Sequence, residues 1–316
     1  MSTSSLSLRI ERIDVLTPRI RRLILVDEHR SPLPPFAPGA HIELHVPGER
    51  AMRRAYSLVN NGAPDHYEIA VQLEDASTGG SRWIHSLSEG ECVLIQPPSN
   101  HFPLQAHDTS VLLIAAGIGI TPILGMARHL QAQGARFSLH YAGRDATQMA
   151  YLQEVRNLPD SHCWISNATA SGRMPVREIL ERAPQDQHLY ICGPKRLVST
   201  VFDTAAELGW AHERLHCELF AGSLESADEQ PYEAQLRDSG ITLQVPVGSS
   251  LIDVMIDAGL DPLFDCRSGT CGVCVTQVRE GEIEHRDNCL TERERASGSF
   301  CACVSRARGK RLVLEL

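Results

Sequence analysis

Three cysteines late in the chain are spaced as ligands for a metal cluster. Cys266, Cys271 and Cys274 follow the pattern C-x4-C-x2-C, which is the spacing of plant-type [2Fe–2S] sites. Gly269 and Gly272 in this loop carry no Cβ, so the backbone can wrap closely and direct N–H groups at the cluster sulfurs. The spacing therefore predicts a [2Fe–2S] cluster with these three cysteines as ligands.

The fourth ligand must come from further along the chain. Spacing alone allows Cys301 or Cys303. A zinc site is the alternative, because C-x2-C also suits zinc, but zinc sites usually pair two such knuckles and the sequence lacks the second. Most of the 10 cysteines lie between Cys266 and Cys303, and in a chain of 316 residues this crowding favours metal binding over a disulfide framework.

A glycine-rich turn predicts a nucleotide site. Gly117 and Gly119 follow a continuous apolar run, and Thr121 comes just after them at the start of an expected helix. Such a turn lets the backbone approach a pyrophosphate, although a plain strand–helix turn has the same pattern. Cys192-Gly193-Pro194 supports the nucleotide interpretation, because it comes just past another buried strand, where open α/β sheets bind their ligands.

Two segments nearer the N-terminus could hold a flat, phosphorylated cofactor. Arg54-Ala55-Tyr56-Ser57 combines a cation, an aromatic ring and a hydroxyl on one expected strand; an amphipathic strand with a surface arginine is the alternative. Gly79-Gly80-Ser81-Arg82 precedes a helix-like run, so its N–H groups and polar side chains could cradle a phosphate. The alternative there is a simple helix N-cap at Ser81.

The elements that must position these segments fall into three regions. From about residue 6 to 102, alternating apolar runs separated by proline and glycine predict antiparallel strands that close into a barrel. From about residue 110 to 220, buried strands alternate with helices such as Thr121 to Gln133, which predicts a parallel sheet with helices on both faces. After a short acidic linker, strands surround one expected helix, Ser250 to Ala258, in a compact third region.

Composition and charge narrow the class of partner. The formal charge of −9 argues against a nucleic-acid-binding protein, which would present a basic face. No apolar stretch is long enough for a comfortable membrane span, and the N-terminus lacks the basic and apolar regions of a secretory signal. The expected location is the cytoplasm, with neither nucleic acid nor membrane as a partner.

Taken together and in this order, the three regions resemble the phthalate dioxygenase reductase family, which provides the reductase components of two-component Rieske oxygenases. Glu284-His285-Arg286-Asp287 and the tail Cys303-Val304-Ser305-Arg306-Ala307 add to the resemblance. It implies a multidomain chain with an antiparallel β-barrel flavin domain, an α/β parallel-sheet NAD-binding domain, a linker and a β-grasp plant-type ferredoxin domain. The corresponding ranges are 1–105, 106–222, 223–231 and 232–316.

The resemblance also implies a role for each matched residue. The flavin ring would be lined by Arg54, Ala55, Tyr56, Ser57, Ala70, Val71 and Gln72, with Phe220 beside it. The flavin phosphate would be held by Gly79, Gly80, Ser81 and Arg82, which favours FMN over FAD. The nicotinamide cofactor would be held by Gly117, Gly119, Cys192, Gly193 and Pro194, with Thr121 and Cys192 closest to the chemistry. The cluster ligands would be Cys266, Cys271, Cys274 and Cys303, which leaves Cys301 as an extra thiol.

The function implied is electron transfer. NADH would deliver a hydride to FMN, and single electrons would pass through the cluster to a Rieske oxygenase acting on an aromatic or other small organic substrate. The residues leave NADH and NADPH open, and the family favours NADH. One alternative is a flavin and iron–sulfur reductase with a different acceptor protein. Another, from a different class, is a redox-sensing iron–sulfur protein that binds a partner without turnover.

Overall fold

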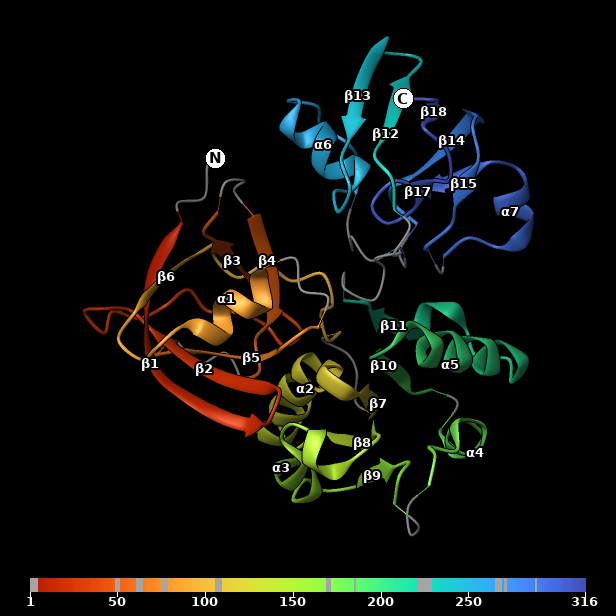
Figure 1. Cartoon of the computed structure of the whole chain (residues 1–316). Coiled ribbons are helices and arrows are strands. Elements are labelled where there is room, and N and C mark those ends of the chain that lie inside the picture. The colour runs from red at the N-terminus through yellow and green to blue at the C-terminus, as the bar shows by residue number, and fades with distance from the viewer. Residues whose placement is uncertain are drawn as a thin grey trace. The chain divides into compact units, whose positions relative to one another are not determined.

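The computed structural model contains two compact units, Met1–Glu218 and Leu219–Leu316 (Figure 1). The predicted flavin and nicotinamide domains lie in the first unit and the predicted ferredoxin domain lies in the second. Among the described residues, no helix is long and apolar enough to cross a membrane. The structure describes residues 5–48, 52–60, 65–75, 79–105, 110–168, 172–184, 186–220, 229–264, 269, 272–287 and 289–316.

The first half of the first unit is an antiparallel sheet in the order β4-β3-β6-β1-β2-β5. Alternation produces it: in β3 every second residue is buried, so one face packs inward. Its two edge strands are joined through the Leu58–Ile69 bridge and through Val59 N–H, which donates to Glu68 O at 2.9 Å, so the sheet closes as the predicted barrel. The elements are β1 Leu6–Thr17, β2 Ile20–Val26, β3 His41–Val46, β4 Met52–Ser57, β5 Tyr67–Gln72, α1 Gly80–Ser86 and β6 Cys92–Ile95.

The second half is a parallel sheet in the order β11-β10-β7-β8-β9. Its central strand β7 is a run of apolar residues buried on both faces, as in sheets covered by helices on each side. Figure 1 shows α2 and α3 on one face and α4 and α5 on the other. The elements are β7 Ser110–Ala116, the 3-10 turn Gly117–Gly119, α2 Ile120–Ala132, β8 Arg136–Gly143, α3 Leu152–Arg156, β9 Ser161–Ile165, α4 Val176–Arg182, β10 His188–Cys192, α5 Lys195–Glu207 and β11 Leu215–Glu218.

A buried polar cluster joins the barrel to the parallel sheet. The carboxylate of Glu68 on β5 accepts a hydrogen bond from Arg128 Nη1 on α2 at 3.0 Å and another from the Tyr151 hydroxyl at 3.0 Å. Arg128 Nε also donates to Glu154 Oε1 at 2.7 Å. Because Glu68 is only 6% exposed, its charge is compensated by these partners rather than by water.

The second unit is the predicted β-grasp fold. Its main sheet has the order β13-β12-β18-β14-β16, with β12 and β18 parallel, and its core includes Phe300, Leu312 and Leu314, which are fully buried. The elements are β12 Tyr232–Leu236, β13 Ile241–Val245, α6 Leu251–Asp257, β14 Val275–Glu280, β15 Ile283–Glu284, α7 Glu292–Ala296, β16 Ser299–Cys301, β17 Arg306–Ala307 and β18 Arg311–Leu314.

One local expectation and one local alternative were wrong. The second unit has a further helix, α7, in addition to the expected one; its Thr291 and Glu294 form a reciprocal capping box, which supports a polar helix with no buried residue. In the first unit, Gly79 rather than Ser81 is the N-cap of α1. The boundaries drawn at 105, 222 and 231 stay predictions.

Candidate redox centres

The two segments predicted for the flavin lie against each other. A Cβ on Gly80, at the start of α1, would stand 2.8 Å from Cγ of Arg54 on β4, so the arginine stem occupies the space that a side chain would need. Gly79 has φ +120, a conformation that L side chains rarely adopt. The structure therefore brings the cationic strand and the glycine turn together on one surface.

Ser81 and Arg82 hold the chain that leads into α1. The Ser81 hydroxyl accepts a hydrogen bond from Glu74 N–H at 3.1 Å, and Arg82 Nη2 donates to Asp75 O at 2.9 Å. Ser81 is buried and Arg82 is exposed. Ser81 and Arg82 stand where an anion could bind at the helix start. Their contact with a flavin phosphate stays a prediction.

The predicted flavin-lining residues of β5 lie beside the same helix. His85 Nε2 on α1 lies 2.9 Å from Val71 O, and burial lowers the pKa of His85, so the neutral ring links helix to strand. Ala70 and Val71 are buried, and Gln72 is half-buried. On β4, burial raises the pKa of Tyr56 to about 12, which keeps its hydroxyl protonated.

The turn predicted for the nicotinamide cofactor packs directly on the segment after β10. A Cβ on Gly119 would lie 2.3 Å from Cys192 O, so glycine alone permits this approach. Gly117 has φ +57, and its carbonyl accepts a hydrogen bond from the Tyr141 hydroxyl at 3.2 Å. The Thr121 hydroxyl donates to Ile118 O at 3.1 Å, within the same turn. Two of the predicted nicotinamide segments therefore meet at the carboxyl ends of β7 and β10, as open α/β sheets require.

Glu218 is a candidate that the sequence interpretation missed. It ends β11, directly beside Cys192 in the parallel register, and forms a hydrogen bond with Ser57 of the barrel. The residue is half-buried, but its Oε2 atom is buried and has no hydrogen-bond partner among the described residues. Burial raises its pKa to about 8, so the carboxyl group can hold or release a proton near neutral pH.

Cys192 and Ser57 complete this junction. Cys192 is fully buried, and burial together with the Glu218 charge raises the pKa of its thiol well above the ordinary value. Its thiol is therefore neutral and unreactive as a nucleophile.

A sequence signal for Glu218 existed: an acidic residue at the carboxyl end of a strand in a parallel sheet stands where such sheets bind ligands. Phe220 belongs to the second unit, and its place beside the flavin stays a prediction.

In the second unit, buried thiols gather where the cluster was predicted. The sulfur atoms of Cys274, Cys301 and Cys303 all lie within 4.8 Å of one another. Cys266 and Cys271 lie outside the described residues. Soft thiolate ligands from converging segments suit an iron–sulfur cluster. The structure brings in Cys301 as well as Cys303, so the choice of fourth ligand stays a prediction.

The loop around the cysteines is shaped by close packing. Gly269 has φ +75, and a Cβ there would lie 2.6 Å from Cγ2 of Val304, the neighbour of Cys303. The Gly269 carbonyl accepts a hydrogen bond from Cys289 N–H at 3.1 Å. The middle of the C-x4-C loop therefore lies on the tail segment that carries Cys303, which is the convergence that a four-cysteine cluster needs.

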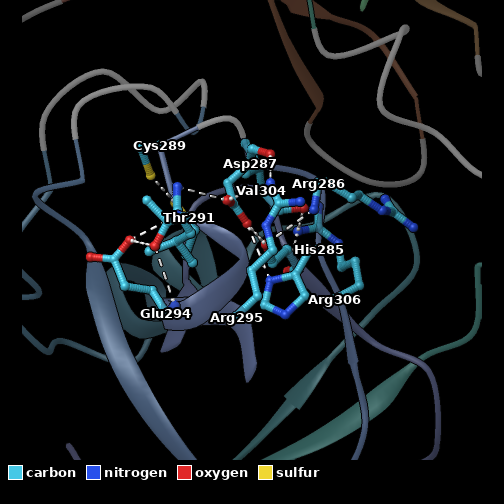
Figure 2. Close-up of polar contacts among 12 residues, drawn as sticks. His285, Arg286, Asp287, Cys289, Thr291, Glu294, Arg295, Val304 and Arg306 are labelled. Carbon is cyan, nitrogen blue, oxygen red and sulfur yellow. Dashed lines mark hydrogen bonds and ion pairs between the residues drawn. The ribbon is translucent and has the colours of Figure 1, made fainter. Parts of the chain in front are cut away.

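Figure 2 shows the polar network that supports this arrangement. The side chain of Asp287 is fully buried; it accepts hydrogen bonds from Ser305 Oγ at 3.0 Å and from Leu290 N–H at 3.2 Å, and pairs with Arg295 at 3.3 Å. Arg306 donates to the carbonyls of Val304 and Ser305 at 2.9 and 3.0 Å. The two motifs that added to the family resemblance thus hold the cysteine-bearing tail in place.

Glu229, at the end of the predicted linker, joins the same network. Its carboxylate accepts from Arg286 Nη1 at 2.7 Å and Arg306 Nε at 3.2 Å, and from Gly248 N–H at 3.0 Å. Although burial opposes it, these donors lower the pKa of Glu229 below its ordinary value. The chain is therefore fixed to the second unit from Glu229 onward.

A barrel, a parallel sheet with a glycine turn and a β-grasp unit with gathered thiols define a flavin, nicotinamide and iron–sulfur reductase. Comparisons agree. Residues 234–308 match the family model described as a 2Fe-2S iron-sulfur cluster binding domain, and residues 93–215 match the N-terminal domain of dimethylamine monooxygenase subunit DmmA-like proteins.

Similarity to whole proteins covers nearly all of the chain. It is 40% identical over 90% of its length to vanillate O-demethylase oxidoreductase of Pseudomonas sp. strain HR199, covering 91% of that protein. It is 38% identical over 98% to the heme-dependent oxidative N-demethylase beta subunit of Ectopseudomonas mendocina strain ymp, covering 99% of it. The solved structure of phthalate dioxygenase reductase matches 99% of the chain at 35% identity with a TM-score of 0.77, over 98% of that structure.

The chain belongs to the phthalate dioxygenase reductase family. It is an electron-transfer oxidoreductase of an oxygenase system, and its C-terminal domain is of the kind that binds a [2Fe–2S] cluster. The predicted family, fold class and reaction class are confirmed.

Proposed function

We propose that this protein carries electrons from NADH through FMN and a [2Fe–2S] cluster to a separate oxygenase component. When bound, the flavin would accept a hydride, which carries two electrons, and would release these electrons singly. The cluster would carry them one at a time. The observation that carries the proposal is the pairing of two sites on one chain. Gly119 packs on Cys192 at a nucleotide-type turn, and Cys274 and Cys303 lie together in a buried thiol group.

We assign the FMN site to the surface formed by β4, β5 and α1. The Arg54 stem packs against Gly80 at the glycine turn, and a cation beside the backbone N–H groups of a helix start suits a single terminal phosphate. The half-buried Tyr56 offers an aromatic face to a flat ring. Extraction of the cofactor followed by chromatography should yield FMN; recovery of FAD would contradict this assignment.

The residues at the carboxyl ends of β7, β10 and β11 would orient the nicotinamide cofactor. Nothing lies within 4 Å of a Cβ built on Gly117, so this part of the turn is open to a pyrophosphate, while Gly119 and Gly193 let the two segments pack closely on each other. The neutral Cys192 thiol would place the nicotinamide beside an uncharged surface. Glu218, with Ser57 as its hydrogen-bond partner, would exchange a proton with the flavin. Its pKa of about 8 makes both the protonated and the ionised carboxyl group accessible near neutral pH. We propose Cys266, Cys271, Cys274 and Cys303 as the cluster ligands.

The partner proposed first is a Rieske oxygenase acting on an aromatic or other small organic substrate, in the cytoplasm where NADH is made. Relatives named for vanillate O-demethylation and phthalate dioxygenation support it. A second candidate is a haem-dependent oxygenase that demethylates an amine. It is supported by the relative of that name and by the DmmA-like match over residues 93–215.

Reconstitution separates these possibilities. The purified chain with NADH should reduce cytochrome c, and no reduction of cytochrome c or of a dye would favour the sensor alternative. Adding a purified Rieske oxygenase or a haem-dependent N-demethylase should then support product formation with one of the two. Failure with both, while cytochrome c is reduced, would point to a different acceptor protein.

A further inference from the structure

The thiol of Cys301 lies among the proposed cluster ligands without being one of them. Cys301 ends β16, which pairs with β14 through Val275, and it is fully buried. Its sulfur lies 3.4 Å from Cys274 Sγ and 3.8 Å from Cys303 Sγ. Both separations are within the range of a hydrogen bond between sulfur atoms.

We propose that Cys301 shares its single S–H hydrogen between the thiolates of Cys274 and Cys303 and thereby raises the reduction potential of the cluster. This inference rests on the ligand set of the proposed function. A cysteine that ligates iron has lost its proton, so the hydrogen between these sulfurs belongs to Cys301. Binding of the cluster thus fixes the direction of two contacts in which either sulfur could otherwise donate.

The physical effect follows from charge. Reduction adds one negative charge to the cluster, and part of that charge resides on its sulfur ligands. A donor aimed at those sulfurs stabilises the reduced form more than the oxidised form, so it raises the potential. The effect is enhanced because Cys301 is screened from water and the local dielectric is low.

Cys289 provides a matched control. Its sulfur lies 4.0 Å from Cys301 Sγ, yet among the described residues it stands outside the group of three sulfurs within 4.8 Å of one another. Removing the Cys289 thiol changes the same region of the unit without removing the proposed donor.

The test compares Cys301→Ala, Cys301→Ser and Cys289→Ala in the full-length protein loaded with both cofactors. The midpoint potential of the cluster is measured by redox titration with EPR detection. We expect Cys301→Ala to shift it to more negative values by the equivalent of about a tenfold change in equilibrium, ~59 mV for a one-electron couple. Cys301→Ser keeps a donor, so its midpoint potential should lie much closer to that of the wild type. Cys289→Ala should leave the potential as in the wild type.

A second measurement detects the donated proton directly. Proton ENDOR of the reduced cluster in H2O and D2O should show an exchangeable coupling that Cys301→Ala loses and Cys301→Ser regains. An unchanged potential and coupling in Cys301→Ala would overturn the donor, as would an equal shift in Cys289→Ala. Loss of iron from Cys301→Ala would make Cys301 a ligand and also overturn it. A wild-type chain without any [2Fe–2S] cluster would instead contradict the proposed function, and the donor with it.

Discussion

Among single residues, the carboxyl group of Glu218 is strongly affected by its surroundings. Its pKa of about 8, against an ordinary value of 4.5, comes from burial and is only partly offset by Ser57. The neutral form is therefore favoured in the folded protein, and the charged form is favoured once the chain unfolds. The contribution to stability is fully present below pH 4.5 and is lost as pH rises through about 8.

Glu218→Gln should flatten this dependence, because the amide has no proton to lose. We expect the melting temperature of the wild type to fall relative to that of the variant between about pH 5 and about pH 9. Glu181→Gln provides a control for the loss of a carboxyl group at an exposed position, and it should change the melting temperature little. A wild-type melting temperature that stays constant relative to that of Glu218→Gln, or that rises relative to it as pH rises, would rule out a raised Glu218 pKa.

Gly119 tests the nucleotide turn. In Gly119→Ala the new Cβ would meet the Cys192 carbonyl, 2.3 Å away, and backbone cannot yield as a flexible side chain can. We expect a loss of about 1–3 kcal/mol in unfolding free energy and a higher KM for NADH in dye reduction. Gly309→Ala, where no atom lies within 4 Å of the new Cβ, should change neither quantity. A Gly119→Ala enzyme with wild-type KM would show that the turn does not contact the dinucleotide.

On the scale of elements, the cluster of Glu68, Arg128 and Tyr151 joins β5 to the helical layer of the parallel sheet. Glu68→Ala would leave the Arg128 charge with fewer partners in a buried position. We expect a loss of about 3–5 kcal/mol in urea unfolding followed by flavin fluorescence. Glu43→Ala, which removes a surface ion pair with Arg53, should cost at most about 1 kcal/mol. Equal losses in both variants would show that Glu68 does not hold the two sheets together.

Sequence patterns were sufficient for the elements with strong periodicity. The alternation in β3, the apolar run of β7 and the cysteine spacing each reflect a local physical requirement, so a single segment reveals them. Helix α7 was missed because its residues are polar and none is buried, although Thr291 and Glu294 carried a capping-box signal. Glu218 was missed because its unusual pKa depends on packing between β11 and the barrel, which one strand of sequence does not encode.

For the whole molecule, the proposed function requires electrons to enter at the first unit and to leave from the second. Cys303→Ala should therefore remove the visible absorption of the cluster and abolish cytochrome c reduction by NADH. The same variant should keep its flavin and reduce a small dye such as ferricyanide, because the sites at Arg54 and Gly119 lie in the first unit. A variant that keeps a full cluster spectrum would transfer the ligand assignment to Cys301.

Anaerobic rapid mixing of the full-length protein with NADH tests whether electrons pass from the flavin to the cluster. Flavin absorbance is followed optically and the cluster by freeze-quench EPR. We expect the flavin to be reduced first and the EPR signal of a reduced [2Fe–2S] cluster to appear afterwards, within the same turnover. A flavin that is fully reduced while the cluster stays oxidised would contradict the proposed function.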